Sequence, residues 1–194
     1  MHAPAGYRSP FLDVIEGLTT PTLTTSATLT LPSDVFYRDA RLTAFIASHR
    51  FQDRGGNALI VPNVPYENLY TVPDELLGAV HVFSKRLARV FKTVYGCGGV
   101  LVRQHNEPAG SQDVWHYHLH VILRFEGDEF YARLPQKIPT TPEERARRAC
   151  APTSRRRSPE PRAAVRGRAR EPSWSWPRRA YGRVRPRARP ALAA

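Results

Sequence analysis

Three histidines at alternate positions, His116, His118 and His120, form the feature that most constrains how this chain can fold. Tyr117 and Leu119 fill the gaps between them. Successive side chains of a β-strand point to opposite faces, so this spacing places all three imidazoles on one face of a sheet. The residues in the gaps then face an apolar core. Such a row of imidazoles can serve as a metal site, or as a nucleophile with helpers for phosphate chemistry.

The net charge of +12 is distributed unevenly along the chain. Residues 1–150 hold 16 Lys/Arg and 15 Asp/Glu, a net of +1, whereas residues 151–194 hold 13 Arg and 2 Glu, a net of +11. The basicity therefore belongs to the C-terminal tail. A solvated extension without a binding role is the favoured interpretation of the tail; the alternative is that it contacts nucleic acid, which the tail alone could do. Since 29 of its 44 residues are Arg, Pro or Ala, the tail has too little apolar surface to fold and is expected to be disordered. An out-of-frame reading of GC-rich DNA would produce the same composition.

Cysteine usage and hydropathy predict a cytoplasmic protein. Cys97 and Cys150 form no disulfide framework, which is typical of a reducing compartment. The N-terminus lacks the basic and apolar runs of a signal peptide. No apolar run approaches the roughly 20 residues that span a bilayer, so no membrane contact is expected.

Apolar periodicity predicts an α+β domain, an antiparallel sheet of about five strands with one long helix packed on it. The helix is expected over residues 73–95, where apolar side chains recur at helical spacing until Gly96. Strands are expected at 35–37, 41–47, 58–61, 100–104 and 114–125.

The domain organisation follows from the same pattern. Residues 1–34 form an irregular N-terminal segment, in which 11–15 are a turn of helix or a docking segment. Residues 35–140 are expected to form the main folded domain, which contains the three histidines. A short helix starts over 141–150, with Thr141 as its N-cap, but no large apolar side chain follows for that helix to bury.

The stretch from Asn106 to Ile122 resembles the signature of the histidine triad family of nucleotide hydrolases and transferases. That signature is His-φ-His-φ-His-φ-φ, with φ apolar, behind a Gly/Gln loop and an upstream Asn. The loop residues are matched by Asn106, Gly110 and Gln112, and the resemblance spans roughly residues 9–130. It implies a homodimer that hydrolyses or transfers at the α-phosphate of a nucleotide conjugate, such as a phosphoramidate, without a metal or other cofactor.

The resemblance also implies the catalytic roles. His118, the middle histidine, is the expected nucleophile and forms a transient nucleotidyl-histidine intermediate. It attacks through one ring nitrogen while an acceptor holds the other and fixes the tautomer. His116 and His120 are expected to donate to phosphate oxygens.

Residues of the preceding loop are expected to bind the substrate. Backbone N–H groups of Gly110 and Ser111 could hold a non-bridging oxygen, while Gln112 and Asn106 supply neutral donors. Phe45 is expected either to pack in the core or to stack on the base. The other histidines, His2, His49, His81 and His105, carry no motif.

Three positions depart from the family pattern: two concern substrate recognition and one concerns structural zinc. Asp113 stands where members commonly carry Ser or Thr able to donate toward the leaving group. Ala47 stands where many members hold the ribose hydroxyls with an acidic or amide residue. Residues 9–13 lack the paired cysteines that help bind structural zinc in many members, so no metal site is expected.

Two other functions remain open at this point. A nucleotide-binding module with weak turnover, tethered to nucleic acid by the basic tail, would fit Asp113 and Ala47. A zinc enzyme would use the imidazoles as ligands and lose activity with chelator.

Overall fold

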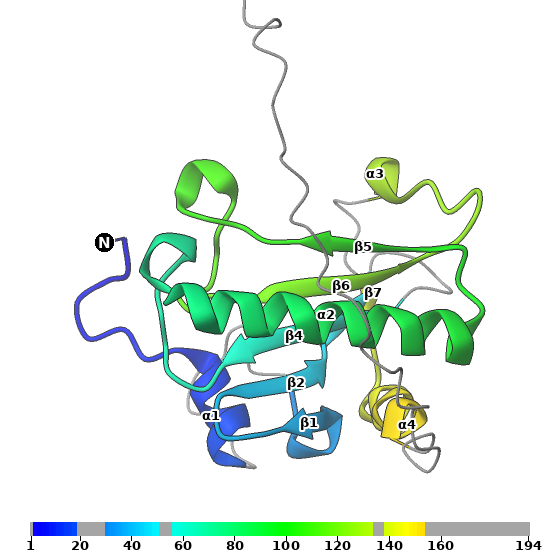
Figure 1. Cartoon of the computed structure of the whole chain (residues 1–194), viewed down its shortest axis with the longest axis horizontal. Coiled ribbons are helices and arrows are strands. Elements are labelled where there is room, and N and C mark those ends of the chain that lie inside the picture. The colour runs from blue at the N-terminus through cyan, green and yellow to red at the C-terminus, as the bar shows by residue number, and fades with distance from the viewer. Residues whose placement is uncertain (1, 19–29, 51–55, 134–137, 154–194) are drawn as a thin grey trace, which may run out of the picture. The chain divides into compact units, whose positions relative to one another are not determined.

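In a computed structural model, residues 2–18, 30–50, 56–133 and 138–153 are described, and they contain a five-stranded antiparallel sheet (Figure 1). Its strands, in spatial order, are β1 (Val35–Arg38), β2 (Leu42–Ile46), β4 (Asn57–Pro62), β6 (Leu119–Arg124) and β5 (Gly99–Arg103). All neighbouring pairs are antiparallel. The predicted fold class is therefore confirmed.

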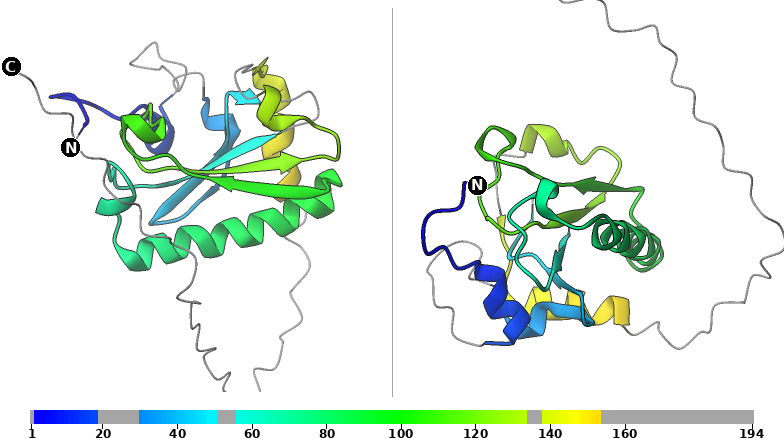
Figure 2. Two further views of the ribbon diagram at one scale, coloured as in Figure 1. Left: turned by 90° about the horizontal axis from the view of Figure 1, so that it is seen from above. Right: turned by 60° about the vertical axis from the view of Figure 1, so that its left-hand side comes forward.

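The two faces of the sheet bury different sets of side chains because residues alternate along each strand. On β2, Ala44 and Ile46 join the core beneath the long helix α2 (Asp74–Tyr95), whereas Phe45 packs on the opposite face with helix α1 (Pro10–Glu16). The left view of Figure 2 shows α2 along one face and α1 on the other. The predicted inward set, Tyr117, Leu119 and Val121, lies in the α2 core.

Helix α2 has the amphipathic pattern predicted for it. Val80, Leu87 and Phe91 are buried against the sheet. The helix ends where Gly96 adopts the left-handed conformation and its N–H bonds the Lys92 carbonyl. Within the described ranges, no helix is long and apolar enough to cross a membrane.

Helix α1 docks an N-terminal segment onto the second face of the sheet. The Ser9 hydroxyl accepts a hydrogen bond from the Phe11 N–H and so caps the helix. Phe11 and Val14 are buried. Arg38 of β1 donates to the Val14 carbonyl at 2.6 Å, which fixes the end of the helix to the sheet edge.

The histidine strand is shorter than predicted, since β6 begins at Leu119 rather than at residue 114. The residues before it bond to a loop instead of a neighbouring strand: the Tyr117 N–H donates to the Tyr66 carbonyl at 2.6 Å. The alternation of side chains nevertheless continues through this segment.

Several short elements carried no periodic signal and were not predicted. They are the helix α3 (Phe130–Arg133), the two-stranded pair β3 (His49–Arg50) and β7 (Ile138–Pro139), and the 3₁₀ turns η2 (Pro32–Asp34), η3 (Leu69–Thr71) and η4 (Pro108–Gly110).

Helix α4 (Pro142–Thr153) corrects the prediction that the C-terminal helix has nothing to bury. Thr141 caps it as predicted, accepting from the Glu144 N–H at 3.2 Å. Its buried residues are Ala149, which joins the α2 core, and Arg145, which is 3% exposed. The contact that the prediction missed is made by the charged side chain of Arg145, which a search for apolar periodicity does not detect. Disorder was predicted from residue 151, but residues 151–153 belong to α4, so that boundary was wrong; the rest of the predicted tail lies outside the described residues.

Arg145 forms a buried ion pair with Asp34. Its Nε lies 2.8 Å from Asp34 Oδ2, and its Nη1 donates to the Thr140 carbonyl at 2.5 Å. Burial raises the pKa of the Asp34 carboxyl, while the Leu31 N–H and Arg145 act in the opposite direction. Each charge of the pair is therefore stable in the buried site only while its partner is present.

Arg145→Ala is expected to lower the free energy of unfolding by about 3 kcal/mol, because it leaves the buried Asp34 carboxylate without its partner. Arg147→Ala, an exposed site on the same helix, is the matched control and should change it by less than about 0.5 kcal/mol. Urea denaturation measures both, and equal effects would contradict the assignment.

Candidate functional site

The three motif histidines lie on the sheet face that α1 covers. The rings of His118 and His120 have centroids 5.0 Å apart. Phe11 of α1 contacts the rings of His116 and His118 edge-on, at 5.6 and 5.2 Å. In the sheet, His120 pairs with Leu59 on one side and with Arg103 on the other. The structure thus brings together the residues that the spacing placed on one face.

His118 has the tautomer that a nucleophile needs. Its Nδ1 lies 2.8 Å from the His116 carbonyl oxygen, which only accepts, so Nδ1 carries the proton and Nε2 the lone pair. This is the acceptor expected from the sequence. Burial lowers the pKa of His118, while the His116 carbonyl and the charge of Asp113 oppose that effect. The lowered pKa keeps the imidazole neutral at neutral pH.

His116 occupies the most enclosed position, with no exposed surface. Its Nε2 lies 2.8 Å from the Pro62 carbonyl at the end of β4, and its Nδ1 lies 2.8 Å from the Ser9 hydroxyl. Both ring nitrogens therefore have protein partners, and the expected donation from His116 to a phosphate oxygen does not match this geometry. His116 is a positioning residue whose carbonyl orients His118.

His120 is half-buried, and its Nδ1 lies 3.2 Å from Oδ1 of the buried Asn57. The Asn57 side-chain oxygen accepts, so Nδ1 of His120 carries a proton. The expected donation from His120 to a phosphate oxygen would then come from Nε2 of the protonated ring.

The amides of Asn106 and Gln112, which were expected to donate to the substrate, hydrogen-bond other protein groups and brace the loop before the motif. Asn106 Oδ1 accepts from the Leu69 N–H at 2.8 Å, and its Nδ2 donates to the Gln104 side chain at 2.7 Å. Gln112 donates to the carbonyls of Glu67 and Val114, at 2.6 and 3.0 Å.

The backbone N–H groups expected to bind phosphate are also engaged. The Gly110 N–H bonds the Glu107 carbonyl, and the Ser111 N–H bonds the Pro108 carbonyl, both within the turn η4. Both N–H groups are used within the turn, so the expected contact between them and a phosphate oxygen would require the turn to open.

Two non-glycine residues of this loop have positive φ. Ser111 is left-handed, at φ 64° and ψ 32°, and Glu107 lies at φ 60° and ψ 166°, a region that glycine alone adopts readily. Gln112 holds Glu107 there, because its Oε1 accepts from the Glu107 N–H at 2.8 Å. The loop is therefore strained and firmly braced.

Phe45 and Asp113 differ in their access to a ligand. Phe45 has no exposed surface and packs against Phe11 with ring centroids 5.6 Å apart, so it is a core residue rather than a stacking platform. Asp113 is exposed, and its charge acts on His118. Ala47 is buried in the same apolar cluster as Phe45.

A fourth histidine, His105, belongs to this site although no sequence motif marks it. Its ring lies edge-on to that of His120, with centroids 6.0 Å apart, and its charge acts on His118. The Nδ1 of His105 lies 2.7 Å from the Gly110 carbonyl. His105 lies two residues beyond Arg103, which pairs with His120, so the register of β5 on β6 brings its ring to the triad, and residue spacing within the motif could not show this.

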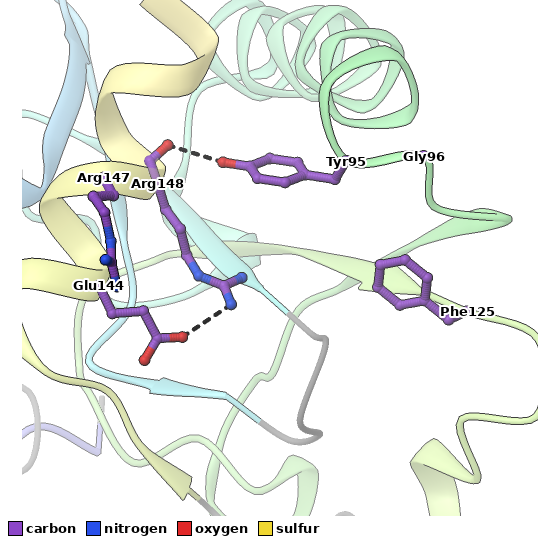
Figure 3. A pocket seen from close by; sticks show the side chains of 6 residues that line it. All are labelled: Tyr95, Gly96, Phe125, Glu144, Arg147 and Arg148. Carbon is purple, nitrogen blue, oxygen red and sulfur yellow. Dashed lines mark hydrogen bonds and ion pairs between the residues drawn. The ribbon is translucent and has the colours of Figure 1, made fainter.

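No group of three or more His, Cys, Asp or Glu side chains in the described part of the chain is arranged to hold a metal ion. A pocket of about 690 Å³ lies elsewhere, lined by residues of α4, the end of α2 and Phe125 (Figure 3). In it the Tyr95 hydroxyl donates to the Arg148 carbonyl, and the Arg148 guanidinium pairs with Glu144. No histidine of the triad lines this pocket.

The fold and the aligned imidazoles define a histidine triad protein. The family model for the HIT domain matches residues 28–127, about half of the chain, and the chain belongs to that family. Membership supports a function related to nucleotides.

Individual relatives agree with the family assignment. "Protein hit" of Bacillus subtilis (strain 168) is 31% identical over 103 residues, which are 53% of this chain and 70% of the relative. A Hit-like protein involved in cell-cycle regulation from Bartonella henselae is 28% identical, with a TM-score of 0.56 over 62% of this chain and 85% of that one. Plasmodium falciparum diadenosine triphosphate hydrolase shares the fold at 13% identity, with a TM-score of 0.55 over 75% of this chain and 95% of that one.

The free energy of unfolding is expected to fall as the pH is lowered from about 6.5 toward 4. Burial lowers the pKa of His116 from 6.5 to about 4, and His118 acts in the same direction. The unfolded chain therefore binds a proton that the folded chain excludes, and this stability, complete above pH 6.5, is lost on acidification. The loss attributable to His116 is about 3 kcal/mol.

Urea denaturation at a series of pH values measures this effect. The His116→Gln variant should lose less stability on acidification than the wild type, and His81→Gln, at an exposed site on α2, is the matched control. Equal pH dependence in all three proteins would show that His116 is not the group responsible.

Proposed function

We propose that this protein hydrolyses or transfers nucleotide conjugates at the α-phosphate through a nucleotidyl-histidine intermediate on His118. The observation that carries the proposal is the 2.8 Å hydrogen bond from His118 Nδ1 to the His116 carbonyl. It directs the lone pair of a neutral imidazole to Nε2, the state in which imidazole attacks phosphorus.

The reaction proceeds in two displacements. The Nε2 lone pair of His118 forms a bond to the α-phosphorus, and the leaving group departs with the electron pair of its own bond. Water then attacks the same phosphorus, the bond to His118 breaks, and the nucleoside monophosphate is released. A neutral imidazole is restored on His118.

Two neighbouring histidines support His118 in this proposal. His120, with its ring centroid 5.0 Å away, acts as an imidazolium and donates from Nε2 to a phosphate oxygen as charge develops. His116 fixes the position of its own carbonyl through Ser9 and Pro62. The likeness to a diadenosine triphosphate hydrolase supports a substrate that contains a nucleotide.

A nucleotide-binding module with weak turnover is the alternative. The exposed Asp113 and the buried Ala47 support it, since neither supplies the donor or ribose contact typical of the family. The expected tether to nucleic acid concerns residues 154–194, which lie outside the described residues.

His118→Ala is expected to lower turnover of an adenosine phosphoramidate by about 10³-fold or more, because it removes the nucleophile. Intact-protein mass spectrometry after a brief incubation and an acid-free quench should detect an adenylyl adduct on the wild type only. His81→Ala is the control. Saturable nucleotide binding with neither adduct nor released AMP in the wild type would favour the binding module.

We also propose that the chain acts as a homodimer. The strand β5 lies at an edge of the sheet, and two apolar side chains, Val102 on β5 and Val82 on α2, are 41% and 53% exposed. Light scattering on the eluted protein should give the mass of two 21.9 kDa chains. A Val102→Asp variant should shift that mass toward one chain, and a wild type of one-chain mass would contradict the proposal.

A further inference from the structure

We propose that His105 is a further catalytic residue of this site, the group that protonates the leaving group. This inference rests on the proposed function. It follows from where the loop between β5 and β6 places the His105 ring, beside His120 on the histidine face.

The first argument is the position of the ring. His120 is in edge-on ring contact with His118 at 5.0 Å and with His105 at 6.0 Å. A phosphate held at His118 and His120 therefore has the His105 imidazole within reach of its substituents. Besides burial, the charge of His105 lowers the pKa of His118, so the two side chains are close enough to interact electrostatically.

The second argument is the orientation of the ring. His105 Nδ1 donates to the Gly110 carbonyl at 2.7 Å, so Nε2 is the nitrogen left to exchange a proton with a ligand. His118 and His120 are oriented in the same way, each with Nδ1 on a protein oxygen. Imidazole is the side chain best suited to proton transfer near neutral pH.

The third argument is the strain of the loop that carries the ring. Glu107 adopts a backbone conformation, φ 60° and ψ 166°, that a residue with a side chain rarely populates. Asn106 and Gln112 hold this path with five hydrogen bonds to Leu69, Gln104, Glu107, Glu67 and Val114. A strained backbone persists only where surrounding contacts hold it. Here those contacts fix the turn whose Gly110 carbonyl orients His105.

His105 gives up a proton in the first displacement and regains one in the second. The imidazolium of His105 transfers its Nε2 proton to the departing amine nitrogen while the P–N bond to that nitrogen breaks and the His118 Nε2–P bond forms. In the second displacement the attacking water gives a proton to His105 Nε2, and the electron pair of the His118–P bond returns to His118. Asp113, which stands where the family commonly places a hydroxyl donor, then has no need to donate.

The test compares two substrates that differ in their need for a proton. The leaving group of an adenosine alkyl-phosphoramidate must be protonated, whereas the 4-nitrophenyl ester of AMP releases a stable phenolate without a proton. His105→Asn keeps an N–H donor for the Gly110 carbonyl. Its kcat/KM, which reports the first displacement alone, is expected to fall about 10²-fold for the first substrate and less than about threefold for the second.

Two controls separate chemistry from loop structure. Asn106→Ala loosens the loop and should slow both substrates by the same factor, while His81→Ala should slow neither. Thermal unfolding checks that each variant is folded. If the wild type turns over both substrates and His105→Asn slows both equally, or neither, His105 is not the proton donor. If the wild type releases no AMP from either substrate, the proposed function fails and the role of His105 fails with it.

Discussion

The buried imidazole of His116 is the contact on which the site depends. It joins the N-cap of α1 through Ser9 to the end of β4 through the Pro62 carbonyl, and its own carbonyl holds His118. Without exposed surface, this ring exchanges no hydrogen bond with water, so its partners alone determine its tautomer. The proposed nucleophile, His118, is thus oriented by a residue that has no exposed surface.

The sequence predicted the parts of this site that follow from local geometry. A spacing of two residues is sufficient to place His118 and His120 on one face, because alternation is a property of any extended strand. The same rule placed Tyr117 and Leu119 in the core. The partners of His116 were not predictable, since Ser9 and Pro62 lie 107 and 54 residues away in the chain.

Residue type alone proved a poor guide to what amide and charged side chains contact. Asn106 and Gln112 match the family motif, and yet hydrogen bonds join them to Leu69 and Glu67, in the segment before α2. Arg145 lies on a helix predicted to have no large apolar side chain to bury, but Asp34 and the Thr140 carbonyl compensate the burial of its guanidinium. A polar side chain is buried only when distant partners converge on it, and periodicity carries no information about those partners.

The contact between Ser9 and His116 has a consequence for biosynthesis. Helix α1 leaves the ribosome long before His116 and His118, which lie more than 100 residues further along the chain. Its apolar partners on β2 and β4 end at Val61, so Phe11 and Val14 have them available well before the histidines of the same face are synthesised. The histidine face is completed only with β6, and a nascent chain that stalls before β6 carries no triad.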